Sequence, residues 1–395
     1  MNLNFSITVI LMLSLVSACS DSKNSVTSVE DQAFPLFEGL IIDPGFEIQI
    51  YASDIESPRQ LAEDRNGRIY VGSRTSGEKT GKIFAIQDTD NNGVVDEKIL
   101  VAENLTMATG VSIFNGDLFF SEIDKIWKIE NIADQLNQHN NNKLPEKILV
   151  TANLPNESWH GWKWLQHDEE GSLYTNVGAP CNVCESDDPR FATILKLEND
   201  SWDYIARGVR NSVGFAFHPV SKKLFFTDNG RDWLGDDSPS CELNRVDSAS
   251  GFYGFPYKHS FNVVDPEYGH IKTGFNFIDP ILNLGAHVAP TGIAFYTGDM
   301  FPSSFKNNLL ITLHGSWNRS KKVGYKVIRV IFDNEGNVIE SKDFISGWLD
   351  VETVPGKPDV ETVLGRPSAP LIMSDGSLLI SDDFGNRIYR ISYKG

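Results

Sequence analysis

Basic residues are scarce in this chain. Its 395 residues include 35 lysines and arginines against 53 aspartates and glutamates, which gives a formal net charge of −18 at pH 7. Proteins that bind nucleic acid need a basic face to follow the phosphates. We therefore exclude nucleic acid as a partner. Hydrophobic residues make up 41% of the chain, which is enough for a sizeable core.

Long hydrophobic runs are absent outside the N-terminus. There, an apolar run of about eleven residues ends in small residues and Cys19, which is typical of a signal peptide and too short to span a bilayer. Residues 16–19 (VSAC) resemble a bacterial lipobox. We expect a signal peptide over 1–18, lipidation at Cys19 and a tether over 19–37, so that the protein is exported, periplasmic or on the cell surface, and touches the membrane only through the lipid. The alternative is an ordinary cleaved signal with an incidental cysteine.

Cysteine is also rare, with four in the chain. Cys181 and Cys184 form a C-x2-C pair, but no second pair or H-x3-H motif completes the four ligands of a zinc site. In the oxidising compartment that export implies, a disulfide between Cys181 and Cys184 is the better interpretation. Cys241 is left as a buried or unexplained thiol.

Helical patterns are few, and residues 130–138 are the one short candidate, whereas a strand pattern recurs. A polar turn followed by an alternating apolar strand appears at 66–74, 115–123, 170–178, 221–229, 306–314 and 375–383. Each copy is followed by a second strand of similar shape, as in GKIFAI or NRIYRI. The first intervals are about fifty residues, which is the period of a four-stranded propeller blade. Insertions at 247–286 and 331–365 lengthen the later units.

These six units predict an all-β fold, a single six-bladed β-propeller over residues 38–395. The sixth unit ends at Gly395 without an outer strand, while an unassigned strand, FEIQIYAS (46–53), precedes the first unit. We expect this N-terminal strand to complete the last blade, because that pairing removes an exposed sheet edge.

Two sets of loops are expected to share one face of such a propeller: those that lead into the inner strands and those between middle and third strands. The first set holds Arg59, Thr109, His160, Arg210, Asn211, His287 and Arg366. The second set covers residues 181–190, 228–237, 314–322 and 382–387. Guanidinium groups pair with carboxylates, and Asp, Asn and Gly loops supply oxygens for calcium. The pattern therefore predicts a site for an anionic ligand and a metal.

His160 is the candidate general base. It lies between Trp159 and Trp162, where desolvation would keep the imidazole neutral and able to accept a proton near pH 7. Taken singly, each of these arginines and histidines could equally cap carbonyls or pack in the core; their joint placement favours a site.

Residues 210–219, 227–237, 286–298, 314–330 and 365–391 carry a resemblance to a known family. They resemble the glucose/sorbosone dehydrogenases, quinoproteins that use pyrroloquinoline quinone (PQQ) and calcium, and are most similar in appearance to the L-sorbosone and pyranose dehydrogenase branches. The resemblance implies oxidation of a sugar or sugar aldehyde, of aldose, sorbosone or pyranose type, by hydride transfer to the quinone.

The resemblance also implies roles for individual residues. His160 is similar to the catalytic base. The residues implied to hold the cofactor are Arg59, Arg210, Asn211, His314 and Arg366, with Trp317 and Arg319 packing on it or pairing with it. Calcium would be held by the backbone carbonyls of Gly230 and Arg231, with Asp232. The insertion at 247–286, which contains Tyr253, Tyr257 and His259, is expected to shape the sugar pocket.

Other functions remain open at this point. One is a calcium-dependent propeller hydrolase such as a sugar lactonase, and another is a non-catalytic carbohydrate-binding propeller. For a dehydrogenase, no haem motif C-x-x-C-H is present because Glu185 follows Cys184, so electrons would pass to a separate quinone or cytochrome. Residues 88–99 resemble a calcium loop at four positions but lack the final bidentate glutamate, which leaves a structural calcium and a plain turn as alternatives.

Overall fold

The computed structural model describes residues 39–395 except 76–78, 139–142, 334 and 354. The expected signal peptide, Cys19 and tether lie outside the described residues. Nearly all regular structure is strand, with one short helix, α1 (Ile132–Asn137), and one 3₁₀ turn, η1 (Ser303–Phe305), in the described part. The helix falls within the segment 130–138 that the sequence indicated. No helix among these residues is long and apolar enough to cross a membrane.

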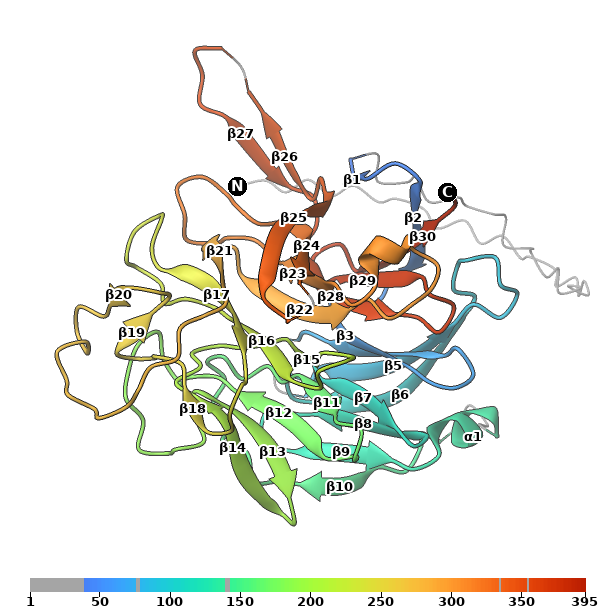
Figure 1. The fold of residues 1–395 in the computed structure, drawn as a ribbon. Coiled ribbons are helices and arrows are strands. Elements are labelled where there is room, and N and C mark those ends of the chain that lie inside the picture. The colour runs from blue at the N-terminus through green and yellow to red at the C-terminus, as the bar shows by residue number, and fades with distance from the viewer. Residues whose placement is uncertain (1–38, 76–78, 139–142, 334, 354) are drawn as a thin grey trace, which may run out of the picture. The chain divides into compact units, whose positions relative to one another are not determined.

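Six antiparallel sheets are arranged as blades in a ring, which confirms the predicted β-propeller (Figure 1). The first blade is β3 (Pro58–Glu63), β4 (Ile69–Ser73), β5 (Gly81–Gln87) and β6 (Glu97–Leu105). The second is β7 (Val111–Phe114), β8 (Asp117–Ser121), β9 (Ile126–Ile129) and β10 (Ile148–Thr151). The third is β11 (Leu165–His167), β12 (Leu173–Val177), β13 (Thr193–Glu198) and β14 (Ser201–Arg207), extended by the parallel strand β18 (Gly251–Phe252).

The remaining blades follow in chain order. The fourth is β15 (Phe215–Phe217), β16 (Leu224–Asp228), β17 (Ser240–Arg245) and β21 (Leu282–Ala286). The fifth is β22 (Pro290–Phe295), β23 (Leu309–Leu313), β24 (Lys326–Phe332) and β25 (Val338–Ser346), and the two-residue β1 (Ile41–Ile42) joins its edge. The sixth is β28 (Pro367–Ile372), β29 (Leu378–Asp382), β30 (Arg387–Tyr393) and β2 (Phe46–Ser53).

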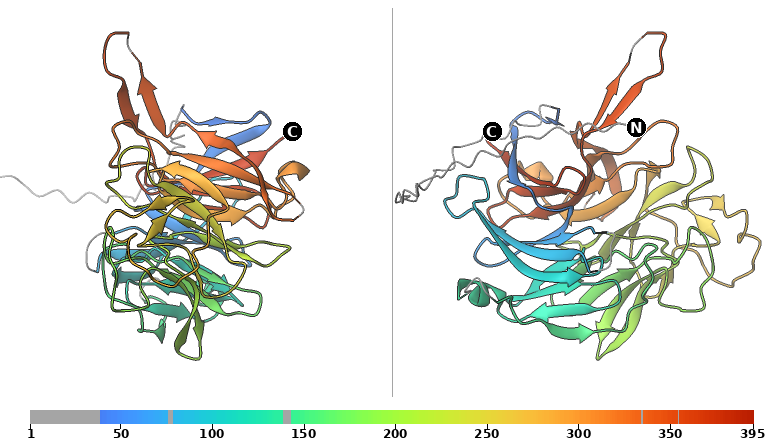
Figure 2. Two further views of the ribbon diagram at one scale, coloured as in Figure 1. Left: turned by 60° about the vertical axis from the view of Figure 1, so that its left-hand side comes forward. Right: turned by 180° about the vertical axis from the view of Figure 1, so that it is seen from behind.

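The ring closes as the sequence predicted. Strand β2 pairs antiparallel with β30 from Phe46 opposite Tyr393 to Ser53 opposite Arg387. The view from behind shows the blue strand β2 and the red strand β30 side by side in one blade (Figure 2). The N-terminal segment also supplies β1 to the fifth blade, which the sequence reading did not foresee.

The two long insertions also contain the outer strands of their own blades, β21 and β25. The first insertion forms the small hairpin of β19 (Lys258–His259) and β20 (Val263–Val264), and its β18 crosses to the third blade. The second forms the hairpin of β26 (Leu349–Glu352) and β27 (Val360–Val363), which projects from the ring in Figure 1.

The core consists of six apolar clusters, one between each pair of adjacent blades. The middle strands are therefore buried on both faces; β16 (LFFTD) and β23 (LLITL) have no exposed residue. Inner strands approach one another closely at glycines. A Cβ on Gly214 of the fourth blade would lie 1.9 Å from the carbonyl oxygen of Thr291 in the fifth, so only glycine fits there.

Closure by β2 predicts a large loss of stability when its buried side chain is removed. Tyr51 is 2% exposed in the cluster between the sixth and first blades. We expect Tyr51→Ala to lower the free energy of unfolding in urea by about 3–5 kcal/mol. Val94→Ala, at a side chain that is 46% exposed, is the control and should change it by less than about 0.5 kcal/mol. Similar values for the two variants would contradict this role for β2.

Candidate active site

A cavity of about 510 Å³ opens at one end of the central channel. It is lined by residues from both predicted sets of loops, which therefore do share one face. Among the predicted site residues, the lining includes His160, Arg59, Arg210, Asn211, His314, Trp317, Arg366, Gly230 and Asp232. His287, Arg74, Trp159, Trp162 and Asn318 also line it. Such a volume is in the range of small-molecule sites.

Arg210 is buried at the cavity wall and uses all of its guanidinium donors on protein oxygens. Nε and Nη2 donate to the carbonyl and side-chain oxygens of Asn182, at 2.8 and 2.9 Å. Nη1 donates to the carbonyl oxygens of Asn229 (3.1 Å) and Gly230 (2.9 Å), and Nη2 also reaches Asp232 Oδ2 at 3.2 Å. The guanidinium thus joins the loop after β12 to the loop after β16.

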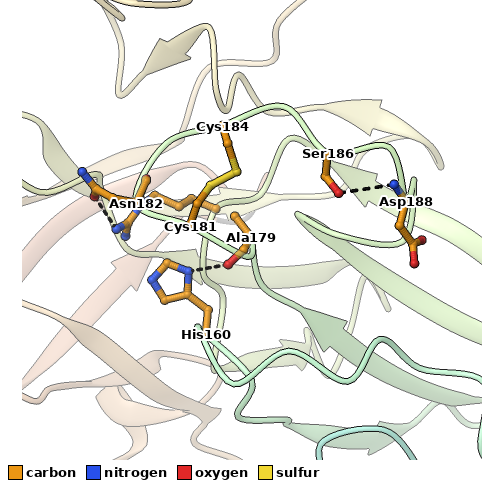
Figure 3. The surroundings of a disulfide bond; sticks show 8 residues. His160, Ala179, Cys181, Asn182, Cys184, Ser186 and Asp188 are labelled. Carbon is orange, nitrogen blue, oxygen red and sulfur yellow. Dashed lines mark hydrogen bonds between the residues drawn. A yellow bond between two sulfur atoms is a disulfide. The ribbon is translucent and has the colours of Figure 1, made fainter.

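Asn182 is the second partner in this junction, and sequence reasoning did not single it out. Besides accepting from Arg210, its Oδ1 accepts from the backbone N–H of Asp232 at 2.8 Å and its Nδ2 donates to the Asp232 carbonyl at 3.1 Å. Asn182 lies between Cys181 and Cys184, which the structure joins in a disulfide (Figure 3). The disulfide closes the short loop that presents Asn182 to the site.

The same loop orients His160. Its Nδ1 lies 2.9 Å from the carbonyl oxygen of Ala179, so Nδ1 carries the proton and Nε2 is left with a free lone pair (Figure 3). Burial, with the nearby charge of Arg210, lowers the pKa of His160 to about 3 despite that hydrogen bond. The imidazole is therefore neutral at physiological pH. Gly178 lies directly beneath, because a Cβ there would come within 2.5 Å of His160 Cβ.

A buried carboxylate, Asp383, holds the opposite side of the cavity together. It pairs with Arg59 at 2.8 Å, with Arg74 at 3.5 Å, and accepts from His314 Nε2 at 2.7 Å. Burial alone would raise the pKa of Asp383, but the charge of Arg59 and the contacts from His314 and Arg74 outweigh it and hold the pKa well below its usual range. Burial lowers the pKa of His314 to about 4. Arg366 donates from Nε to the His314 carbonyl at 3.0 Å.

The proposed calcium loop presents its residues in different directions. The side chain of Arg231 turns away from the cavity into a buried pair with Asp265 (2.5 Å), and it also reaches Glu267 at 3.0 Å. Only its backbone is left for a metal. Asp232 keeps its carboxylate at the cavity, where Oδ1 accepts from Asn318 Nδ2 at 2.9 Å.

Some predicted residues do not reach the cavity. Arg319 donates to the carbonyl of Asp236 and to the Asp237 carboxylate, so it ties the loop after β23 to the loop after β16. Tyr253, Tyr257 and His259, in the insertion expected to shape the sugar pocket, do not line this cavity: Tyr253 and His259 are buried, and Tyr257 donates to Glu185 at 2.6 Å.

Two further sequence features have defined surroundings. Cys241 is a buried free thiol. In the segment 88–99, carboxylate oxygens of Asp88, Asp90 and Asp96 lie within 4.8 Å of one another. A structural calcium there stays a prediction.

The residues missed by sequence reasoning, Asn182, Asp383 and Arg74, share one signal. Each follows the middle strand of its blade, the position that also supplies Gly230 and His314. Asn182 and Asp383 lay within loops assigned to the mouth, and Arg74 in the sequence IYVGSR occupies the equivalent place in the first blade. Each of these loops holds several polar residues. Contacts between blades decide which of them faces the cavity, and the sequence does not show those contacts.

Comparison with known proteins places the chain in a family. Residues 37–316 match the model of a domain of unknown function, DUF7133. The chain belongs to the DUF7133 family. Residues 270–394 also match the model described as TrAA12-like. An uncharacterized protein of Borreliella burgdorferi is 33% identical over 93% of this chain and 95% of its own length.

Other similar proteins have named activities. A pyrroloquinoline quinone-dependent sugar dehydrogenase of Hypocrea jecorina is 21% identical over 78% of this DUF7133 chain and 79% of its own length. The holo PQQ domain of pyranose dehydrogenase from Coprinopsis cinerea shares the fold, with a TM-score of 0.71 and 18% identity over 89% of this chain and 97% of that one. The calcium structure of a Trichoderma reesei enzyme of carbohydrate-active family AA12 also shares the fold, with a TM-score of 0.72. It is 19% identical over 90% of this chain and 97% of that one.

Neutralising Asp383 is expected to destabilise the protein, because Arg59 and His314 would then lie buried without their partner charge. We expect Asp383→Asn to lower the free energy of unfolding by about 3 kcal/mol at pH 7. The pKa of Asp383 is lower in the folded state than in the unfolded state, so its contribution is present above the ordinary aspartate pKa. It is lost as the pH falls below about 4.

Urea unfolding of wild type and variant at pH 8, 6, 5 and 3.5 measures this difference. Asp299→Asn is the matched control, since that side chain is 95% exposed, and should cost less than about 1 kcal/mol. A difference for Asp383→Asn that grows on acidification would contradict the assignment.

Proposed function

We propose that the protein is a quinoprotein that oxidises a sugar or sugar aldehyde of aldose, sorbosone or pyranose type, with PQQ and calcium as cofactors. The observation that carries the proposal is one cavity lined by four guanidinium groups and a neutral, oriented histidine, His160. The similarity to PQQ-dependent sugar dehydrogenases supports it. From the N-terminal sequence we also propose that the protein is exported and carries a lipid anchor at Cys19.

The cavity fits PQQ, a planar tricarboxylate. Arg59, Arg74, Arg210 and Arg366 line it, whereas Asp232 is the only carboxylate among the described lining residues, so the cavity wall carries more positive than negative groups. Asp383 pairs with Arg59 and Arg74 from behind the lining. The buried Oδ1 of Asn211 and Nε of Arg59 have no hydrogen-bond partner among the described residues, so they are available to a ligand. Indole rings of Trp159, Trp162 and Trp317 also line the cavity and suit a flat molecule.

The loop after β16 fits calcium by donor type. The carbonyls of Gly230 and Arg231 and the carboxylate of Asp232 are hard oxygen ligands. The Gly230 carbonyl and Asp232 Oδ2 accept hydrogen bonds from Arg210 in this structure. Calcium binding would require Arg210 to release these oxygens, and the freed guanidinium would then be available to a carboxylate of the cofactor.

The protein's own residues supply the proton chemistry. When bound, the quinone would accept hydride and calcium would polarise it. His160 Nε2 would take the substrate hydroxyl proton as the C–H hydride leaves, giving a carbonyl product. The hydrogen bond from Nδ1 to Ala179 fixes the ring during this transfer. Arg210 beside the ring disfavours the imidazolium, so the proton is readily passed on to solvent.

The calcium-dependent hydrolase is the second candidate considered, and the lining argues against it. Such an enzyme needs several side-chain carboxylates on a channel metal. Asp232 is the only carboxylate among the described residues that line the cavity, and its oxygens are engaged by Arg210 and Asn318. We further propose that electrons leave to a separate quinone or cytochrome.

Cofactor reconstitution tests the proposal. We expect apoprotein titrated with PQQ and calcium to develop the absorbance of bound quinone and to reduce an artificial dye when aldoses, sorbosone or pyranoses are added. A calcium chelator should abolish this activity and added calcium should restore it. Absence of both cofactor binding and dye reduction with every sugar would refute the proposal.

Removal of the base separates binding from chemistry. We expect His160→Ala to bind PQQ normally and to lose about 100- to 10,000-fold in kcat, because the hydroxyl proton has no acceptor. His270→Ala, at an exposed histidine, is the control and should retain full activity. Equal activity of the two variants would remove His160 from the mechanism.

Arg74 tests the anionic character of the ligand. Its side chain is 40% exposed, and the one polar contact described for its guanidinium group is with Asp383 at 3.5 Å. Replacing Arg74 should therefore leave the fold intact. We expect Arg74→Gln to weaken PQQ binding about tenfold through loss of a charge-assisted hydrogen bond. Arg65→Gln, at a side chain that is 68% exposed on a β3–β4 turn, is the control. Calorimetric titration with PQQ measures both, and unchanged affinity would contradict the role of Arg74.

A further inference from the structure

The exposed tryptophans of this protein gather at the mouth of the cavity. The chain has eight tryptophans, all within the described residues. Trp159, Trp233 and Trp317 are 51%, 69% and 67% exposed, whereas the other five are buried or half-buried. Trp159 and Trp317 line the cavity, and Trp233 contacts Trp317. Indole is costly to expose, so this concentration at one place indicates a binding surface.

Trp233 is held outward by its own backbone. It has a φ of 72°, a conformation that bulky side chains rarely adopt. The residues beside it are fixed on both sides. Asp232 is bonded to Asn182 and Asn318, and the Gly235 carbonyl accepts from His287 Nε2 at 2.7 Å. The contacts of the loop therefore maintain an unfavourable backbone angle that places the indole in solvent, which is typical of functional positions.

Trp233 and Trp317 form one apolar platform. Their ring centroids lie 5.6 Å apart and their planes are perpendicular, at 89°. In such an edge-to-face pair, one ring contacts the other with its edge, so its own faces stay open to a ligand. Trp317 also lines the cavity, whereas Trp233 does not. The platform thus leads from the cavity to the outside.

Carbohydrate is the ligand class that suits these features. A pyranose ring has an apolar C–H face that stacks on an indole and a rim of hydroxyls that needs polar partners. The loop that carries Trp233 offers such a partner in Asp237, whose side chain is 89% exposed while its Oδ1 accepts from Arg319 at 2.9 Å. A ligand stacked on Trp233 would lie outside the cavity where the proposed oxidation occurs.

We propose that Trp233, with Trp317, forms an outer sugar-binding subsite, so that the end of an oligosaccharide or polysaccharide binds more tightly than a free monosaccharide. This inference rests on the proposed function: one terminal sugar unit would occupy the cavity while the next unit stacks on the platform. A chain of at least two sugar units is required to reach both places.

Binding to the apoprotein tests the subsite without any turnover. Gluco-, xylo-, manno- and chito-oligosaccharides of one to five units are titrated by calorimetry and tryptophan fluorescence. We expect affinity to rise at least tenfold from the monosaccharide to the pentasaccharide in one series. Trp233→Ala should abolish that rise, and Trp233→Phe should restore most of it, because a phenyl ring still stacks. Val220→Ala, at an equally exposed apolar side chain, is the control and should behave as wild type.

Kinetics of the reconstituted enzyme give an independent readout. Trp233→Ala should raise KM for the pentasaccharide at least tenfold while kcat changes little. Affinity that is independent of chain length, no binding to any series, or a Trp233→Ala variant with wild-type binding would each overturn the inference. A change from dimer to monomer in Trp233→Ala by sedimentation would also overturn it, since the platform would then be a protein interface. Length-dependent binding, with neither cofactor binding nor dye reduction for any sugar, would uphold the subsite and refute the proposed dehydrogenase.

Discussion

The arrangement of the site depends on the burial of Arg210. A guanidinium taken out of water needs an acceptor for each N–H, and this one finds them on two loops that leave different blades. The oxygens concerned belong to the loop closed by the disulfide and to the loop proposed to hold calcium. Because Arg210 and Asn182 connect them, the Ala179 carbonyl that orients His160, in one loop, and the carboxylate of Asp232, in the other, keep a fixed relative position. Protein contacts therefore hold the two loops together without a ligand, and the proposed calcium would take the Gly230 and Asp232 oxygens over from Arg210.

The fold could be predicted from the sequence because a propeller repeats the same strand pattern in every blade. Each blade places a middle strand without exposed residues between two turns, so six copies of one short pattern determine the architecture, and the unpaired strand at 46–53 has only one open edge to join. The site was accessible in part for the same reason, since topology alone brings Arg59, Arg210 and Arg366 to one mouth. Side-chain contacts between blades could not be predicted from the sequence. Asp383 could not be recognised as the partner of Arg59, which lies 324 positions earlier, because no local pattern records that pairing.

The departure at Arg319 has the same origin. Arg319 lies on a loop near the mouth, as expected, but local charge decides whether a loop side chain faces the cavity or a neighbouring loop. The same holds for the side chain of Arg231, a residue of which only the backbone carbonyl was expected at the metal. Arg231 finds the buried Asp265 in the insertion, and Arg319 finds Asp236 and Asp237. The insertion therefore supports the cavity from outside by holding the loop after β16, instead of lining it with Tyr253 or His259.

The low pKa of His160 means that a ligand must raise the basicity of this residue before it can act as a base. A base whose conjugate acid has a pKa of about 3 binds a proton weakly, and burial and the charge of Arg210 are the causes. A carboxylate that pairs with Arg210 would neutralise this charge and raise the basicity of Nε2. In the proposed reaction, an anionic cofactor would thus activate the base while it occupies the site. The positively charged wall would then serve two purposes, to bind the cofactor and to keep His160 a poor base until the cofactor is present.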